Sequence, residues 1–165
     1  MSATAFGLGS NLGDRLGSLR TALGMLRERF VVLQTSDVFE TAPWGVPDQP
    51  YFLNACVLAE CNVAPERLLE EVKQIERSMG RTPSRRWGER SIDVDILLMD
   101  GLCLATPTLT IPHAEMCARD FVLVPLAQIL PDWVHPIANK TAAALAAEVQ
   151  GARGVGAPPL RICRL

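Results

Sequence analysis

Residues 91–99, SIDVDILLM, decide the fold, because apolar and polar side chains alternate over 91–96 with the two-residue period of a β-strand. The apolar side chains at the even positions fall on one face of such a strand, and Asp93 and Asp95 fall together on the other. We therefore predict a strand over 92–99 that covers a core with one face and presents two carboxylates on the other.

The flanking sequence predicts the neighbours of this strand. Asp100-Gly101 is typical of a two-residue hairpin turn and predicts a return strand over 102–104. Upstream, Pro65 occupies a favourable first position for a helix, which we expect to end at Gly80. The apolar face of that helix contains Leu68, Leu69, Val72, Ile75 and Met79.

The rest of the chain supplies further short elements. In chain order we expect a strand over 4–8, a helix capped by Asp14, β-structure over 31–39, an ordered loop over 41–50, a buried strand over 52–63, two short helical segments over 114–130 and a helix over 141–149. This order predicts an α+β fold, a ferredoxin-like sandwich in which a mainly antiparallel sheet is covered by helices. We expect a single domain over 1–150 and a loosely attached C-terminal extension over 151–165.

The composition of the 165 residues narrows the class of protein. With 48% hydrophobic and 21% charged residues, the chain has enough apolar material for a core, unlike an intrinsically disordered protein. No apolar run reaches the roughly 18 residues of a membrane span, and no charged-then-apolar leader opens the chain. A formal charge of −2 argues against a general nucleic-acid binder, and five cysteines without a C-x-x-C pair argue against disulfides or zinc. We expect a cytoplasmic protein that binds neither membrane nor nucleic acid.

Two carboxylates on one strand face, about 6.6 Å apart at their α-carbons, repel each other unless positive charge lies between them. Mg2+ suits this position, because it binds one or two carboxylates and completes its octahedron with water and phosphate oxygens. Five of the fourteen arginines fall within residues 77–90, a segment with a single acid, Glu89. Guanidinium groups bind phosphate, so this combination indicates a nucleoside triphosphate site. The alternative is a solvated strand face whose carboxylates form salt bridges with the arginines.

Other residues could complete a binding site. His113 precedes Arg119 by six residues and could donate to a phosphate or a leaving oxygen, although a lone histidine is more often structural. Phe52 and Phe121 could sandwich a flat heterocycle while the amide of Asn54 reads its edge. Core packing is the alternative role for either phenylalanine.

Three further features bear on a ligand site. Trp44 and Trp87 lie in predicted loops, where an exposed tryptophan usually contacts a ligand or another part of the protein. Glu76 is either a helix-surface acid or a carboxylate that faces a ligand cleft. The stretch GLGSNLG at 7–13 only weakly resembles a dinucleotide-binding turn, because its third glycine comes one residue late. A Walker A motif is absent from the sequence, so arginines and metal would have to hold any triphosphate.

With these residues assembled, the chain resembles the hydroxymethyldihydropterin pyrophosphokinases, folate-pathway enzymes that transfer the pyrophosphoryl group of ATP to 6-hydroxymethyl-7,8-dihydropterin and release AMP. The resemblance covers about residues 5–135. Its motifs are GLGSNLGDR, ETAPWG, DQPYFLNACV, IERSMGR, RWGERSIDVDILL and TIPHAEMCARDFVLVPL. It implies a pterin pyrophosphokinase domain over 1–150 that acts as a stand-alone, monomeric enzyme on small-molecule substrates.

The resemblance also implies roles for individual residues. Asp93 and Asp95 are the implied ligands of two Mg2+ ions, with ATP as co-substrate. The residues implied in binding ATP and its pyrophosphate are Glu76, Arg81, Trp87, Arg90, His113 and Arg119. The residues implied in binding the pterin are Thr41, Ala42, Pro43, Trp44, Phe52, Asn54 and Phe121. The residues implied in catalysis are Arg81, Arg90 and Asp95.

The sequence departs from the family pattern at several of these positions. Ala114 stands where members often carry a tyrosine near the nucleotide, and Lys73 stands where some place a glutamine that touches the base. Ala42 replaces a common proline, and Trp44 replaces a smaller apolar residue. The arginine-rich loop is one residue shorter, so no individual roles are given to Ser84, Arg85 and Arg86.

The implied mechanism is in-line attack of the pterin hydroxymethyl oxygen on the β-phosphorus of ATP, with Asp95 or water taking the proton. Two alternatives remain open at the level of sequence. One is another Mg-ATP-dependent kinase that acts on a hydroxylated heterocycle. The other is a non-catalytic ferredoxin-like ligand-binding module, in which the acids and arginines form a surface salt-bridge network.

Overall fold

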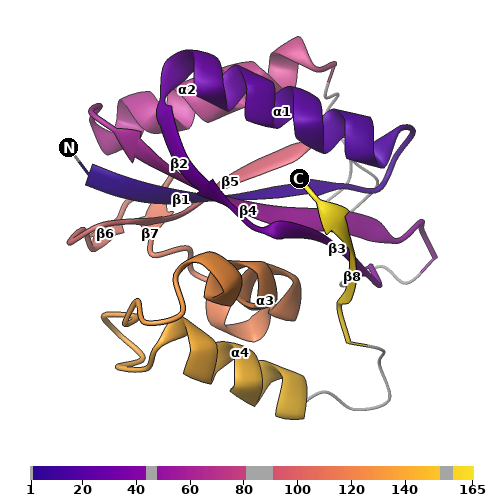
Figure 1. The fold of residues 1–165 in the computed structure, drawn as a ribbon. Helices are drawn as coiled ribbons and strands as arrows, with labels where there is room; N and C mark the ends of the chain where they lie inside the picture. Colours follow the sequence, from indigo (N-terminus) through magenta and orange to yellow (C-terminus); the bar gives the residue numbers. More distant parts are fainter. Residues whose placement is uncertain (1, 44–47, 81–90, 153–157) are drawn as a thin grey trace.

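A computed structural model describes residues 2–43, 48–80, 91–152 and 158–165, which form a sheet with helices on both faces (Figure 1). The main sheet has six strands in the order β5-β1-β4-β3-β8, with β2 also paired to β4, and every pair is antiparallel. The strands are β1 Ser2–Ser10, β2 Val31–Thr35, β3 Asp37–Thr41, β4 Phe52–Cys61, β5 Asp93–Met99 and β8 Leu160–Arg164. The predicted α+β, ferredoxin-like sandwich is confirmed.

The helices begin at the residues whose side chains or backbones favour a helix start. The helices are α1 Arg15–Arg29, α2 Pro65–Ser78, the short 3-10 turn η1 Met116–Ala118, α3 Asp120–Ile129 and α4 Ala142–Gly151. Asp14 caps α1 by accepting the N–H of Gly17 at 3.0 Å, and Thr141 caps α4 by accepting the N–H of Ala144. In the described part of the chain, no helix is both long enough and apolar enough to cross a membrane.

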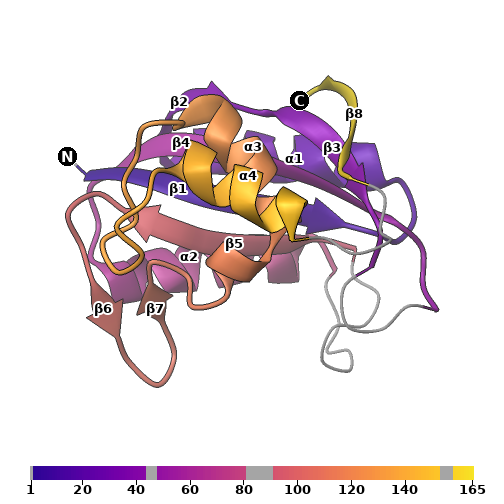
Figure 2. The same ribbon diagram turned by 90° about the horizontal axis from the view of Figure 1, so that it is seen from below.

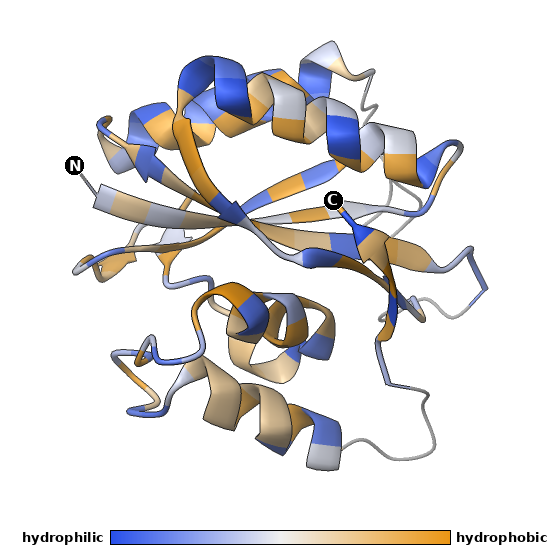
Figure 3. Ribbon diagram, in the orientation of Figure 1, coloured by the Kyte–Doolittle hydropathy of each residue, from blue (hydrophilic) through white to orange (hydrophobic). Residues whose placement is uncertain are grey.

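The helices divide between the two faces of the sheet, and each face has its own core. Helices α1 and α2 lie on one face, and α3 and α4 lie on the other (Figures 1 and 2). Phe6 and Ile75 are fully buried on the first side, and Leu97 and Leu123 are buried on the second. Figure 3 shows the hydrophobic residues gathered along the strands and along the helix faces that meet them. Burial of this apolar surface holds the layers together.

The predicted hairpin after β5 is wrong. A turn does form at Asp100-Gly101, where Gly101 has a φ of +69° and the N–H of Leu102 donates to the carbonyl of Met99. The chain then leaves β5, and β6 Leu104–Ala105 pairs instead with β7 Thr110–Ile111. The turn therefore directs the chain away from β5 and into a small separate sheet on the β5 side (Figure 2).

The expectation of a loosely attached tail is also wrong for residues 158–165. Strand β8 pairs with β3 at the edge of the main sheet. Arg161 Nε lies 2.6 Å from Oδ2 of Asp37, a buried carboxylate that also accepts a hydrogen bond from Gln128 of α3. These bonds hold the pKa of Asp37 below its usual range, the Gln128 bond most of all. The division of the chain at residue 150 stays a prediction.

Candidate active site

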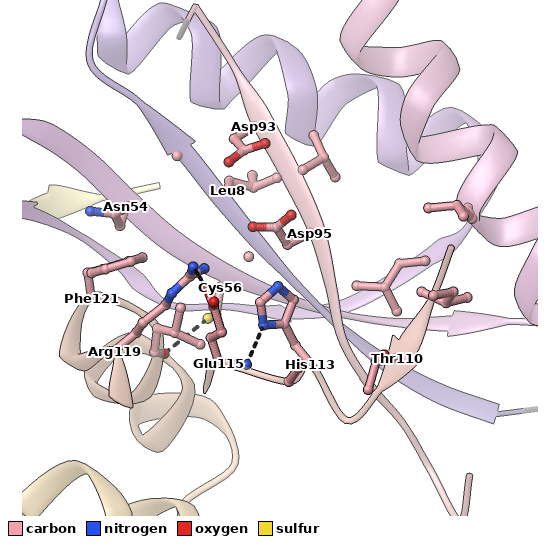
Figure 4. A pocket seen from close by; sticks show the side chains of 18 of the residues that line it. Leu8, Asn54, Cys56, Asp93, Asp95, Thr110, His113, Glu115, Arg119 and Phe121 are labelled. Atoms are coloured by element: carbon pink, nitrogen blue, oxygen red, sulfur yellow. Dashed lines mark hydrogen bonds and ion pairs between the residues drawn. The ribbon is translucent and has the colours of Figure 1, made fainter. Parts of the chain in front are cut away.

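A cavity of about 530 Å³ opens on the face of the sheet that α3 covers (Figure 4). Its floor is formed by β1, β4 and β5, and its walls by the β6–β7 connection and by the segment that leads into α3. Three consecutive neighbours in the sheet order, β5-β1-β4, therefore bring residues from distant parts of the sequence to one place.

The two carboxylates of β5 project into this cavity on the same side. Figure 4 shows Asp93 and Asp95 one above the other, facing Arg119 and His113. Val94, between them in sequence, is buried on the opposite face, as the alternation of a strand requires. The prediction that both acids share one face is confirmed.

Glycines in β1 make room for the carboxylates. Gly9 pairs with Asp93 and Gly7 pairs with Asp95, so no side chain stands beside either acid on that strand. A Cβ atom added to Gly9 would lie 3.1 Å from Oδ1 of Asn54, closer than ordinary van der Waals contact. The glycines of β1 therefore keep the cavity floor open between the acids and Asn54. They do not form a phosphate-binding loop at a helix N-terminus.

The state in which both carboxyls of β5 are ionised is electrostatically unfavourable. Burial, followed by the negative charges of Asp93 and Glu76, raises the pKa of the Asp95 carboxyl to about 7, although Lys73 and Arg119 act in the opposite direction. The donor set fits a hard divalent cation, because two carboxylate oxygens on one face are the ligands that Mg2+ prefers and its charge removes the repulsion. Within the described ranges, no group of three or more His, Cys, Asp or Glu side chains is arranged to hold a metal ion.

Glu76 supports β5 from the side of α2. Its side chain is 3% exposed; Oε1 accepts the N–H of Val94 at 2.9 Å, and Oε2 accepts a hydrogen bond from Nζ of Lys73 at 3.0 Å. Among the described residues, Lys73 lines the cavity whereas Glu76 does not. The contacts of Glu76 thus fix the backbone between the two acids.

His113 is held as a neutral ring. Its Nδ1 accepts the N–H of Glu115 at 3.3 Å, and its own backbone N–H donates to the carbonyl of Leu97. Burial, and then the charge of Arg119, lower the pKa of His113, so at pH 7 the ring proton resides on Nε2. Nε2 can therefore donate to an anionic ligand in the cavity.

Arg119 stands where two parts of the cavity meet. Its guanidinium forms an ion pair with Glu115, and its Cζ lies 5.6 Å from the centre of the Phe121 ring. The cation thus faces the acids on one side and an aromatic ring on the other (Figure 4).

The opposite end of the cavity is built from amide, hydroxyl and aromatic groups. Nδ2 of Asn54 donates to Oγ1 of Thr41 at 2.6 Å, and both side chains are buried. Phe52 and Phe121 line the same end, together with Ala42. This end suits a flat, polar heterocycle better than a phosphate, because it offers apolar faces and an amide edge.

The structure brings most of the predicted residues to this one cavity. Those that line it are Thr41, Ala42, Phe52, Asn54, Asp93, Asp95, His113, Arg119 and Phe121. Within the described ranges, Pro43 and Glu76 lie outside the lining. Four predicted residues fall outside the described residues, namely Trp44, Arg81, Trp87 and Arg90, as do Ser84, Arg85 and Arg86.

Several lining residues were not predicted from the sequence. They are Gly7, Gly9, Cys56, Leu69 and the threonines Thr106, Thr108 and Thr110. The alternate glycines were a visible signal, but their meaning depends on which strands flank β1. The threonines carry no signal that distinguishes them from an ordinary polar turn.

Comparison with known proteins shows the family of the chain. The model of the family described as 7,8-dihydro-6-hydroxymethylpterin-pyrophosphokinase (HPPK) matches residues 5–131. The 2-amino-4-hydroxy-6-hydroxymethyldihydropteridine pyrophosphokinase of Aquifex aeolicus is 38% identical over 140 residues, which are 85% of this chain and 88% of that protein. Its namesake in Bacillus subtilis is 45% identical over 124 residues, 74% of each chain.

A solved structure shares the fold. The wild-type HPPK-DHPS of Plasmodium falciparum with pteroate superposes with a TM-score of 0.75 at 18% sequence identity, covering 89% of this chain and 42% of that one. With the family model matching most of the chain and the relatives matching most of their own length, the chain belongs to the hydroxymethyldihydropterin pyrophosphokinase family.

Proposed function

We propose that the cavity binds 6-hydroxymethyl-7,8-dihydropterin at its Asn54 end and Mg-ATP at its carboxylate end. The chain is an ATP-dependent pyrophosphokinase of folate synthesis, which transfers the pyrophosphoryl group of ATP to the pterin hydroxyl. The observation that supports this division most strongly is that one cavity is lined by two acids on β5 and by an amide and two phenylalanines, Asn54, Phe52 and Phe121. The first group suits phosphate with metal, and the second suits a heterocycle.

At the pterin end, Asn54 reads the edge of the ring and the phenylalanines hold its faces. The bond from Asn54 to Thr41 fixes the orientation of the amide before any ligand arrives, so binding does not have to order it. Phe52 and Phe121 supply the apolar surfaces on which a flat ring stacks. By family resemblance, Ala42, Pro43 and Trp44 also serve the pterin.

At the nucleotide end, Asp93 and Asp95 would hold two Mg2+ ions. Bound Mg2+ supplies positive charge that aligns the phosphates and offsets the charge developing on them. His113, through Nε2–H, and Arg119 donate to phosphate oxygens from the wall of the cavity. By family resemblance, Arg81, Arg90, Trp87 and Glu76 also serve the nucleotide side.

The transfer is a substitution at the β-phosphorus of ATP. The pterin hydroxymethyl oxygen forms a bond to Pβ, the bond from Pβ to the oxygen that bridges the α- and β-phosphates breaks, and that oxygen leaves on AMP. The hydroxyl proton passes to Asp95 or to water. Little covalent work falls to the protein, so its contribution is alignment of the two substrates and stabilisation of the transferring group by Arg81 and Arg90.

The test is incubation of the chain with ATP, MgCl2 and the reduced hydroxymethyl pterin. AMP and the pterin pyrophosphate should form in equal amounts. ADP as the product would indicate an ordinary kinase. In a calorimetric titration, a non-hydrolysable ATP analogue should bind more tightly with Mg2+ than without it, whereas equal binding would indicate a surface salt-bridge network in place of a metal site.

We also place this reaction in the cytoplasm and assign it to a monomer. The five cysteines are all free thiols, as a reducing compartment maintains them. Sedimentation of the active chain at about 18 kDa would agree with a monomer, and a mass near twice that value would contradict it.

A further inference from the structure

The turn between β1 and α1 contains two side chains that the reaction does not use directly. Asn11 follows the last residue of β1, and Arg15 is the first residue of α1. Both belong to the GLGSNLGDR motif, whose glycines open the cavity floor. Neither Asn11 nor Arg15 lines the cavity within the described part of the chain.

Arg15 bridges the two ends of the segment that joins β3 to β4. One of its terminal nitrogens, Nη1, donates to Oε2 of Glu40 and to the carbonyl oxygen of Tyr51, each at 2.8 Å. Glu40 directly precedes Thr41, and Tyr51 directly precedes Phe52. A single cation thus ties together the residues next to the two strand ends that form the proposed pterin wall.

Asn11 holds the same segment one step further along. Its side chain is buried, with 1% of the residue exposed. Nδ2 of Asn11 donates to Oε1 of Gln49 at 3.0 Å and to the carbonyl of Pro50 at 3.1 Å. Together, the two side chains fix residues 49–51 immediately before β4 begins.

The bridge from Arg15 to Glu40 lies on the opposite face of the sheet. Side chains alternate along β3, so Glu40 points away from the face that carries Thr41 and the cavity. The pairing of Thr41 with Phe52 is the last in the β3–β4 ladder, where a two-strand ladder would otherwise separate most easily. A charge-assisted brace at that point limits how far Thr41 and Phe52 can move apart.

We propose that Arg15 and Asn11 are positioning residues for the pterin end of the cavity. Through Glu40 and Tyr51, Arg15 sets the spacing of Thr41 and Phe52, and so the orientation of Asn54, which donates to Thr41. This inference rests on the proposed assignment of that end to the pterin. It predicts a loss confined to pterin binding, because the hydrogen bonds of both residues go to the chain beside the proposed pterin wall.

The test compares Arg15→Met with Arg20→Met, an exposed arginine on the same helix. Methionine keeps most of the aliphatic length and removes the guanidinium. Affinities for the pterin and for a non-hydrolysable ATP analogue with Mg2+ are measured by titration, and KM values are measured for both substrates. We expect Arg15→Met to weaken pterin binding about tenfold and to leave nucleotide binding within about twofold. Arg20→Met should match the wild type in both.

A double-mutant cycle and a second variant make the test decisive. Glu40→Gln should weaken pterin binding in the same direction, and combining it with Arg15→Met should add little, because both changes break one bridge. If Arg15→Met does not fold, Glu40→Gln and Asn11→Ser carry the same expectation. Unchanged pterin affinity in folded variants, or equal losses for pterin and nucleotide, would overturn the inference.

Failure of the inference differs from failure of the proposed function. Asn54→Ala should weaken pterin binding if that end of the cavity takes the pterin. An impaired Asn54→Ala beside a normal Arg15→Met would reject only the brace. A normal Asn54→Ala would reject the assignment of the pterin end, and with it the inference.

Discussion

The two ends of the cavity are prepared for their ligands in opposite ways. At the Asn54 end, the amide is bonded to Thr41 before any ligand is present, and Arg15 braces the surrounding strand ends. At the β5 end, two carboxylates lie together, and the pKa of Asp95 is raised to about 7. The first end is fixed by a hydrogen bond in the free protein, whereas the second contains a carboxyl, Asp95, whose charged form is disfavoured by burial and by neighbouring negative charge. Within one cavity, the Asn54 end therefore depends on preformed hydrogen bonds, and the β5 end depends on charge.

The largest effect should come from removing charge at the β5 end. Asp95→Ala should reduce AMP formation at least about 1,000-fold, because the proposed Mg2+ site loses a ligand and the transferring phosphates lose the charge of the metal. The thermal unfolding temperature should not fall, since a repulsive carboxylate has been removed. AMP release is followed by chromatography, with Asp100→Ala, an exposed acid at the following turn, as the matched control. Near-normal turnover would reject the metal role of Asp95.

A smaller, selective effect should follow from changing the amide end. Asn54→Ala should raise the KM for the pterin about 100-fold. The polar edge of the pterin ring would lose its hydrogen-bond partner in a site that excludes water. The KM for ATP should change by less than about threefold. Steady-state kinetics with each substrate varied in turn provide the comparison. Equal increases in both KM values would mean that the two ends are not separate.

Gly9 lies between the ends and should link them. In Gly9→Ala the new Cβ would sit 3.1 Å from Oδ1 of Asn54, so the amide must shift by a few tenths of an ångström. We expect a rise of about tenfold in the pterin KM and a weaker effect on metal-dependent nucleotide binding. Double substitution with Asn54→Ala should be less than additive, and full additivity in the kinetics would contradict the contact.

The last expected effect is on the stability of the metal-free protein and on its dependence on pH. The folded-state pKa of Asp95, about 7, lies above its ordinary value of 3.8, so the folded protein holds a proton that the unfolded chain has released between these pH values. This group therefore stabilises the metal-free protein fully below pH 4, and that contribution is lost as pH rises through 7. Asp95→Asn should be more stable than the wild type at pH 8, by on the order of 4 kcal/mol.

Thermal unfolding in EDTA at pH 4.5 and pH 8 provides the measurement. The stability difference between Asp95→Asn and the wild type should be small at pH 4.5 and clear at pH 8. Since every other titrating group is common to the two proteins, a difference that does not change with pH would contradict the raised pKa of Asp95.

Local periodicity was sufficient for much of the fold. The alternation over 92–96 predicted β5 and its shared carboxylate face, and Asp14 and Pro65 marked the starts of two helices. Where the sequence failed, the outcome depended on a distant partner. The Asp100-Gly101 turn formed, but Leu104–Ala105 paired with Thr110–Ile111 and not with β5, and the tail became a strand because β3 offered it an edge.

The sequence by itself determined which chemical groups the site contains, because carboxylate, amide, imidazole and guanidinium side chains have fixed chemistry and the strand period places neighbours on one face. Only the tertiary structure decided that Gly9 leaves space beside Asn54, that Glu76 supports the backbone of β5, and that Arg15 bridges Glu40 to Tyr51. Each of these contacts joins residues at least 18 positions apart. No local pattern specifies such distances; they follow from how the strands pair and the layers close.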